Sequence, residues 1–104
     1  MTIQFNTGSN VNGTETMQEK FTELIAGKLD RFSEQITRIE VHLNDVNGKK
    51  EGQDDKRCVL EARLEGLQPV AVTGNGDTYD GAVIGAIEKM KAALDTVIGK
   101  LRTH

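Results

Sequence analysis

The feature that most constrains the fold is a long amphipathic segment near the end of the chain, Asp77 to Arg102. Its apolar residues recur with the i, i+3, i+4, i+7 spacing of one helical face. They are Tyr79, Val83, Ala86, Ile87, Met90, Leu94, Val97 and Leu101. At 1.5 Å per residue the predicted helix is roughly 39 Å long. An apolar stripe of that length needs an extended apolar surface beneath it, so the pattern predicts a helix lying across a sheet.

The two ends and the far side of this helix have further features. Asp77 is the predicted N-cap, because its carboxylate can accept a hydrogen bond from an amide of the first turn. Asp80 places negative charge where the helix dipole favours it. The face opposite the apolar stripe carries small residues, which either pack closely against a partner or are simply exposed. These residues are Gly81, Gly85, Ala92 and Gly99.

The upstream chain supplies the sheet. Apolar and polar residues alternate in several short stretches, which is typical of half-buried strands. One longer stretch, from about residue 14 to 32, has helical spacing and a plausible cap at Thr14. Turn-rich segments separate these elements. The predicted strands cover residues 2–6, 36–44, 57–65 and 69–73.

The resulting order is β-α-β-β-β-α, which predicts a single α+β domain spanning residues 1–104. The last three strands have direct connections and are expected to form an antiparallel meander. The first two are joined through a helix and are expected to pair in parallel by a right-handed crossover. Each strand has only one apolar face, so both helices are predicted on the same face of a four-stranded mixed sheet. The other face carries mixed charges, which predicts cross-strand pairing.

Composition excludes several classes of protein. No apolar run approaches the roughly 18 residues of a membrane-spanning helix, and the N-terminus lacks the pattern of a signal peptide, so a cytoplasmic location is expected. The formal net charge of −3 and the pI near 5.3 argue against indiscriminate binding to nucleic acids. A local basic face remains compatible with an acidic total.

Nothing in the sequence assembles a catalytic centre or a metal site. Cys58 is the only cysteine and alternates onto the apolar face of its strand, while His42 and His104 lack a nucleophile or ligand cluster nearby. The acidic loop 45–57 does not match the calcium-loop spacing, and the GNGD stretch at 74–77 lacks a phosphate-binding motif, which favours a simple turn. We therefore expect no enzyme activity, no cofactor and no metal.

Cations on the two predicted helices are the remaining candidates for a functional site. Neighbouring helices on one sheet can combine such residues into a band that tracks phosphates. Charged flanks are equally expected of any amphipathic helix, so both interpretations remain open from the residues alone. The candidate rRNA-binding residues are Lys20, Lys28, Arg31, Lys89, Lys91, Lys100 and Arg102.

Two stretches resemble a known family. The passage KLDRFSEQITRIEVHLN, from Lys28 to Asn44, is similar to the helix-to-strand passage of the ribosome hibernation-promoting factors and ribosome-associated inhibitors, also called sigma-54 modulation proteins. Asp77-Thr78-Tyr79, followed by Lys89-Met90, is similar to the opening of that family's last helix. The family's element order matches the one predicted here, and the chain resembles its short form.

The resemblance implies a function without catalysis. Members of this family bind the small ribosomal subunit where tRNA and mRNA would lie, and so silence idle ribosomes. The implied partners are the 30S subunit and its 16S rRNA, and Lys28, Arg31 and Lys89 match basic positions of the family. Ala92, Thr96 and Gly99 stand where relatives carry further cations, which puts the strength of ribosome binding in doubt. The alternative is a diverged member that binds a protein or itself through the small-residue face.

Overall fold

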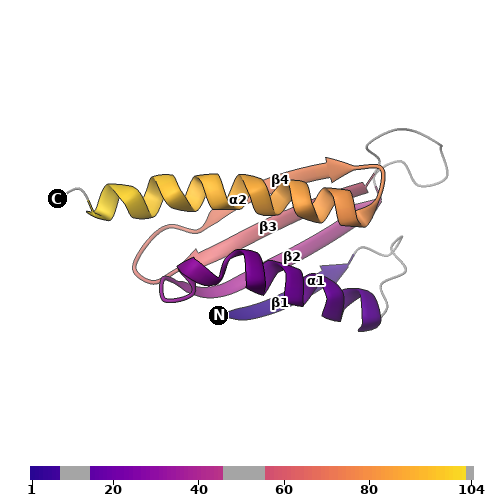
Figure 1. The fold of residues 1–104 in the computed structure, drawn as a ribbon, viewed down its shortest axis with the longest axis horizontal. Coiled ribbons are helices and arrows are strands. Elements are labelled where there is room, and N and C mark those ends of the chain that lie inside the picture. Colours follow the sequence, from indigo (N-terminus) through magenta and orange to yellow (C-terminus); the bar gives the residue numbers. More distant parts are fainter. Residues whose placement is uncertain (8–14, 46–55, 103–104) are drawn as a thin grey trace.

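A computed structural model of the chain describes residues 1–7, 15–45 and 56–102 (Figure 1). The element order is the predicted β-α-β-β-β-α, with one additional 3₁₀ turn after the first helix. The turn-rich segment was predicted from Thr7 to Gly13, but Thr7 is the last residue of the first strand. Residues 8–13, the predicted Thr14 cap and residues 46–55 of the predicted loop lie outside the described residues. The elements are β1 (Thr2–Thr7), α1 (Glu15–Lys28), η1 (Asp30–Phe32), β2 (Ile36–Asp45), β3 (Lys56–Leu64), β4 (Val70–Gly76) and α2 (Tyr79–Arg102).

The four strands form one mixed sheet in the order β1-β2-β3-β4. Strand β1 pairs in parallel with β2, and Phe5 lies opposite Val41. The β2–β3 and β3–β4 pairs are antiparallel. Between β3 and β4 the chain turns at Gly66, whose φ of 73° is a conformation that glycine adopts without steric cost. The predicted pairing of the strands is confirmed.

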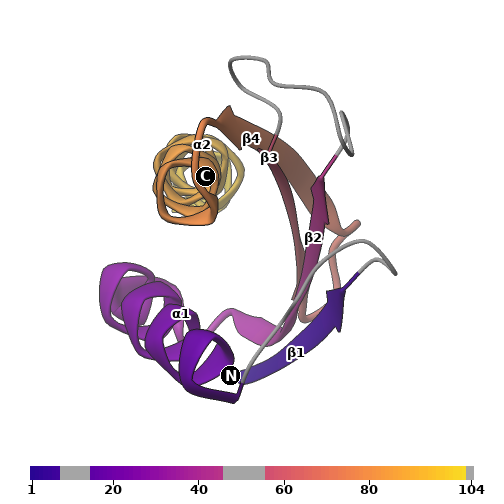
Figure 2. The same ribbon diagram turned by 90° about the vertical axis from the view of Figure 1, so that its right-hand side faces the viewer.

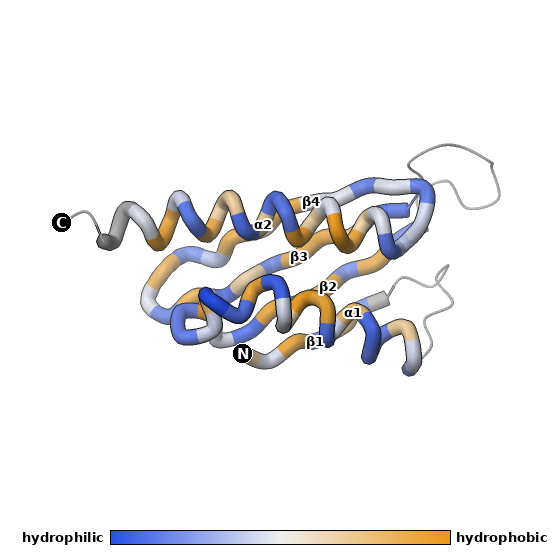
Figure 3. Tube along the Cα trace, in the orientation of Figure 1, coloured by the Kyte–Doolittle hydropathy of each residue, from blue (hydrophilic) through white to orange (hydrophobic). Residues whose placement is uncertain are grey.

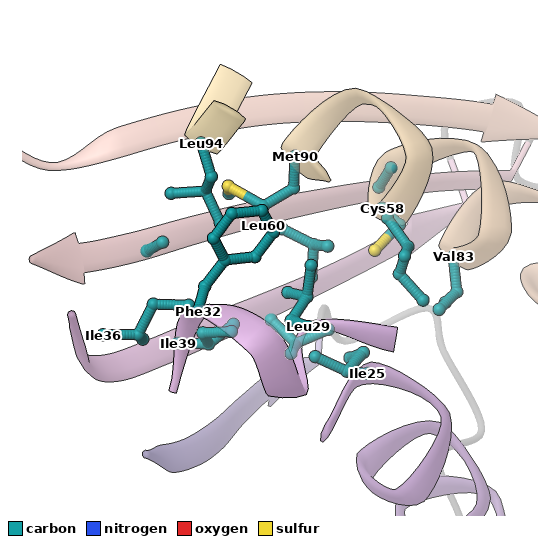
Figure 4. Close-up of a cluster of buried hydrophobic side chains, with 14 of the residues drawn as sticks. Ile25, Leu29, Phe32, Ile36, Ile39, Cys58, Leu60, Val83, Met90 and Leu94 are labelled. Carbon is teal, nitrogen blue, oxygen red and sulfur yellow. The ribbon is translucent and has the colours of Figure 1, made fainter. Parts of the chain in front are cut away.

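Both helices cover the same face of the sheet, as predicted (Figure 2). Hydrophobic residues recur along the strands and both helices (Figure 3), and the buried ones from these elements form one core cluster. There Phe32 of η1, Leu60 of β3 and Met90 of α2 meet in one cluster (Figure 4). Burial of this layer excludes water from most of the apolar surface and is the main source of stability. The opposite face of the sheet is not covered by either helix.

The first helix is shorter than predicted. It ends at Lys28, and the last predicted residues form a 3₁₀ turn instead, in which the Phe32 amide donates to the Leu29 carbonyl at 2.9 Å. Leu29 and Phe32 are both buried. Their spacing of three residues suits an α-helix and a 3₁₀ turn equally, because side chains three apart lie on one side in both.

Strand β4 is longer than predicted and includes Gly74 and Gly76, so the GNGD stretch is mainly strand rather than turn. A Cβ atom on Gly74 would lie 2.2 Å from the carbonyl oxygen of Ala82 in α2. Two backbones approach this closely only where a side chain is missing. The helix begins at Tyr79, and its cap is Thr78 rather than the predicted Asp77, since the Gly81 amide donates to the Thr78 hydroxyl at 3.0 Å.

Candidate nucleic-acid interface

The two helices are joined at their exposed surface by ion pairs. The Lys20 ammonium of α1 pairs with the Asp80 carboxylate in the first turn of α2. The Arg31 guanidinium of η1 pairs with the Asp95 carboxylate, about four turns further along α2 than Asp80, at 2.9 Å. We call the line between these two pairs the helix seam. All four side chains are more than half exposed, so each pair is worth only about 0.2–1 kcal/mol.

Arg31 is additionally held by an aromatic ring. Its guanidinium carbon lies 4.4 Å from the centroid of the Phe32 ring, a distance at which a cation is attracted to the ring face. A small cavity of about 250 Å³ opens beside this pair and is lined by Arg31, Phe32, Asp95, Ile98 and Gly99. The guanidinium is therefore held in a defined position at one end of the helix seam.

Lys28 differs from the other cations on this side. It is the last residue of α1, it is exposed, and it has no hydrogen-bond or ion-pair partner among the described residues. Lys91 lies on the seam side of α2, because it follows Asp80 by 11 residues, or about three turns. Its ammonium is 3.9 Å from the Glu88 carboxylate, a loose pair within the same helix. Among the described cations of α1, η1 and the seam side of α2, Lys28 is therefore free, whereas Lys20, Arg31 and Lys91 are paired.

Lys89 lies on the other flank of α2. It follows Asp80 by nine residues, about two and a half turns, and so faces away from the helix seam. Its ammonium donates a hydrogen bond to the carbonyl oxygen of Thr73 on the edge strand β4 at 2.8 Å. The structure therefore does not place Lys89 in the same band as Lys20, Lys28 and Arg31.

The last two candidate cations lie at the end of α2, which contains the backbone of Lys100 and Arg102. Their side chains lie outside the described part of the structure. Among the positions where relatives carry cations, Ala92 and Thr96 are exposed, and the Thr96 hydroxyl bonds back to the Ala92 carbonyl at 3.1 Å.

The four small residues of α2 do not form one open surface. Gly81 and Ala92 are exposed, whereas Gly85 and Gly99 are half-buried. A Cβ atom on Gly85 would lie 3.9 Å from the Cα atom of Gly74, so Gly85 faces the edge of the sheet. Gly99 lies beside the small cavity at Arg31. Self-association through this face stays a prediction.

The uncovered face of the sheet carries the mixed charges that the sequence places there. Glu40 and Glu61 lie opposite each other on β2 and β3, and Arg63 bridges them with distances of 3.1 and 3.0 Å. Arg38 adds a contact of 3.2 Å to Glu40. The hydrogen bond from Arg63 holds the pKa of Glu40 below its usual 4.5, and the positive charge of Arg38 acts in the same direction. The predicted cross-strand pairing is confirmed.

The cysteine and the histidine that the sequence analysis considered for chemistry lie in the sheet. Cys58 is fully buried, and burial raises the pKa of its thiol to about 12, which makes it a poor nucleophile. His42 lies on the uncovered sheet face, at the position on β2 opposite Val59. Within the described ranges, no three His, Cys, Asp or Glu side chains are placed to share a metal ion. No helix in that part of the chain is long and apolar enough to cross a membrane.

Comparison with known proteins adds two observations. The family model described as "Sigma 54 modulation protein / S30EA ribosomal protein" matches residues 5–102. No curated protein sequence matches the chain.

Two solved structures share the fold at 20% sequence identity. The N-terminal domain of Protein Y from Thermus thermophilus superposes with a TM-score of 0.73, covering 93% of this chain and 99% of that one. A ribosomal subunit interface protein from Coxiella burnetii superposes with a TM-score of 0.69, covering 95% of this chain and 99% of that one.

Proposed function

Because this chain belongs to the sigma 54 modulation protein / S30EA ribosomal protein family, we propose that it binds the small ribosomal subunit and silences translation in idle ribosomes. The observation that carries the proposal is the family match over residues 5–102. It is supported by the shared fold with a ribosomal subunit interface protein. In this proposal the protein acts in the cytoplasm. It occupies the tRNA and mRNA channel of the small subunit and uses no catalysis, cofactor or metal.

The helix seam is the proposed contact with 16S rRNA. Lys20, Lys28 and Arg31 line it, and Lys91 lies on the same side of α2. The ion pairs of Lys20 and Arg31 are exposed and weak, so RNA phosphates can replace the carboxylates at small cost. Among the described residues, Lys28 has no carboxylate partner that a phosphate would have to replace. Lys100 and Arg102 are proposed to extend the contact, and Lys89 to contribute from the other flank.

The paired acids have a consequence for the strength of binding. Asp80 and Asp95 remain close to the phosphates that displace them and repel these phosphates. With Ala92, Thr96 and Gly99 lacking charge, fewer phosphate contacts are available than in a relative with cations there. Because each phosphate contact releases about one counterion, we expect strong binding at low salt and a moderate slope of log K against log salt.

Sedimentation with purified 30S and 70S ribosomes across a salt series tests the proposal. Lys28→Glu reverses the free cation of the helix seam, and Arg57→Glu is its matched control, an exposed arginine on β3 without a described ion pair. We expect roughly stoichiometric binding near 150 mM salt. Lys28→Glu should weaken it about tenfold or more, whereas Arg57→Glu should leave it nearly unchanged. The double variant Lys28→Glu with Arg31→Glu should abolish it, and Lys89→Glu measures the contribution of the other flank.

A parallel measurement addresses the silencing of translation. Added to a purified translation reaction, the protein should inhibit peptide synthesis and approach full inhibition at about one molecule per ribosome, with the same ranking of variants. Absence of binding above background would reject the proposal. Equal losses in Lys28→Glu and Arg57→Glu would reject the helix seam as the contact.

A further inference from the structure

A second surface feature lies on the other side of α1, between this helix and the edge strand β1. It is an open groove of about 620 Å³. Ile3 and Phe5 form its apolar floor, and both are only half-buried. The helix contributes the wall, which consists of Glu15, Gln18, Glu19, Thr22 and Glu23.

The wall is strongly acidic and has no counter-charge. Glu15, Glu19 and Glu23 are exposed, and none has an ion-pair or hydrogen-bond partner among the described residues. The acids at the helix seam, by contrast, are paired with cations. The described residues that line the groove include no lysine or arginine. An apolar floor beside three unpaired carboxylates favours a ligand that combines hydrophobic stems with positive charge, as arginine and lysine side chains do.

The floor of the groove belongs to a strand with an open edge. β1 pairs with β2 on one side and is the last strand of the sheet on the other. Its outward backbone amides and carbonyls therefore have no strand partner in the part of the chain that the structure describes. Such an edge accepts an added strand from a peptide, which gains main-chain hydrogen bonds along its length.

We propose that this groove binds an extended, basic segment of a partner protein, which adds to β1 as a fifth strand and directs arginine or lysine side chains toward α1. The spacing of the two elements supports this geometry. Glutamates four residues apart on a helix are separated by about 6 Å along its axis, and alternate residues of a strand by about 6.6 Å. A cation at every second position of the peptide therefore meets Glu15, Glu19 and Glu23 in turn, while its hydrocarbon stem crosses Ile3 and Phe5.

A second copy of this chain fits the groove less well. The strand it would offer by symmetric edge pairing is β1 itself, whose sequence TIQFNT contains no lysine or arginine. Pairing of two β1 strands would leave all six glutamates of the two copies without a counter-charge. The groove also has no residue in common with the helix seam, so this inference is independent of the proposed function.

A designed peptide tests the inference on the full-length chain. The probe is an end-capped nine-residue peptide of alternating threonine and arginine, titrated at low salt into ¹⁵N-labelled protein. We expect amide shift changes concentrated in β1 and in residues 15–23. The matched peptide with glutamate in place of arginine should not bind.

Substitutions that preserve shape separate this site from general electrostatic attraction. Glu19→Gln with Glu23→Gln removes two charges from the wall and should weaken binding of the probe peptide about fivefold. Glu34→Gln with Glu65→Gln removes two exposed charges outside the groove and should leave binding nearly unchanged. Equal weakening in both double variants, or shifts that map to another surface, would overturn the proposal.

Strand addition has its own control in the peptide. N-methylation of every arginine and N-methylation of every threonine block hydrogen bonds on opposite edges of the added strand, so only one set should abolish binding. If both methylated peptides bind as well as the probe, no strand is added and the proposal is wrong. Self-association of the chain through β1 in the absence of peptide, detected by analytical ultracentrifugation, would identify a second copy as the occupant and overturn it equally.

Discussion

Gly74 of β4 lies against the backbone of Ala86 in α2, so closely that a Cβ atom on Gly74 would stand 2.4 Å from the Ala86 nitrogen. The obstructing atoms belong to the helix backbone, which cannot move aside as a flexible side chain would. The long helix therefore rests on β4 without a layer of side chains at this point, and the position of its N-terminal half depends on the missing Cβ.

Gly74→Ala is expected to destabilise the protein by about 1–3 kcal/mol, because the added methyl group forces helix and strand apart. Gly27→Ala is the matched control, since a Cβ atom there meets nothing within 4 Å on the exposed side of α1. It should stabilise the protein by about 0.5–1 kcal/mol, because alanine favours a helix over glycine. Urea unfolding followed by circular dichroism measures both. A Gly74→Ala protein as stable as the parent would contradict the close packing of α2 on β4.

Removing the acids of the helix seam is expected to strengthen ribosome binding. Asp80→Asn with Asp95→Asn releases Lys20 and Arg31 from their carboxylate partners and removes two repulsions toward phosphate. We expect roughly three- to tenfold tighter sedimentation with 30S subunits near 150 mM salt. Glu34→Gln with Glu65→Gln makes the same change in net charge away from the seam and should have a much smaller effect. Weaker binding by the Asp80 and Asp95 double variant would reject the seam as an rRNA contact.

The charged cluster on the uncovered sheet face predicts a pH effect. The hydrogen bond from Arg63 lowers the pKa of Glu40 in the folded protein relative to the unfolded chain. The stabilisation from this pairing is therefore fully present above the usual pKa of 4.5 that the unfolded chain keeps, and it is lost as the pH falls through the folded value. Glu40→Gln should consequently reduce the loss of stability between pH 7 and pH 3, measured by urea unfolding at both values.

The control for this effect is Glu34→Gln, an exposed glutamate without a described partner, which should leave the acid-side loss unchanged. A direct check is the titration of the Glu40 carboxyl by NMR. Its midpoint should rise toward the usual value in Arg63→Gln, because the first cause of the shift is removed. A midpoint unaffected by Arg63→Gln would show that the guanidinium does not hold the carboxylate.

The spacing of apolar residues along the sequence is sufficient to predict the layers of this fold. Alternation of apolar and polar residues shows which face of a strand is apolar, and helical spacing does the same for a helix. It failed where a distant segment determines the local structure. Gly74 reads as a turn residue in isolation, and only the approach of Ala82 and Ala86 explains its place in a strand. The turn after α1 was missed because Leu29 and Phe32 have a spacing that two kinds of helix share.

The site was less predictable than the fold for the same reason. The sequence identifies the cations of the helices, but not that Arg31 meets Asp95, 64 residues later in the chain. Nor does it separate Lys89, which contacts the carbonyl of Thr73, from the cations of the helix seam. The acidic groove was also missed, although the spacing of Glu15, Glu19 and Glu23 on one side of a helix was visible in the sequence.

The two margins of the sheet are not equivalent. At β4 the Lys89 ammonium occupies the Thr73 carbonyl, and a lysine at this place hinders the approach of another strand. At β1 no described residue plays that part. Polymerisation by strand addition requires an open edge strand on both sides of each sheet, so that every added subunit can accept the next one. A molecule with a single receptive edge stops after one addition, so we expect the Lys89 contact at β4 to disfavour fibril growth by strand addition.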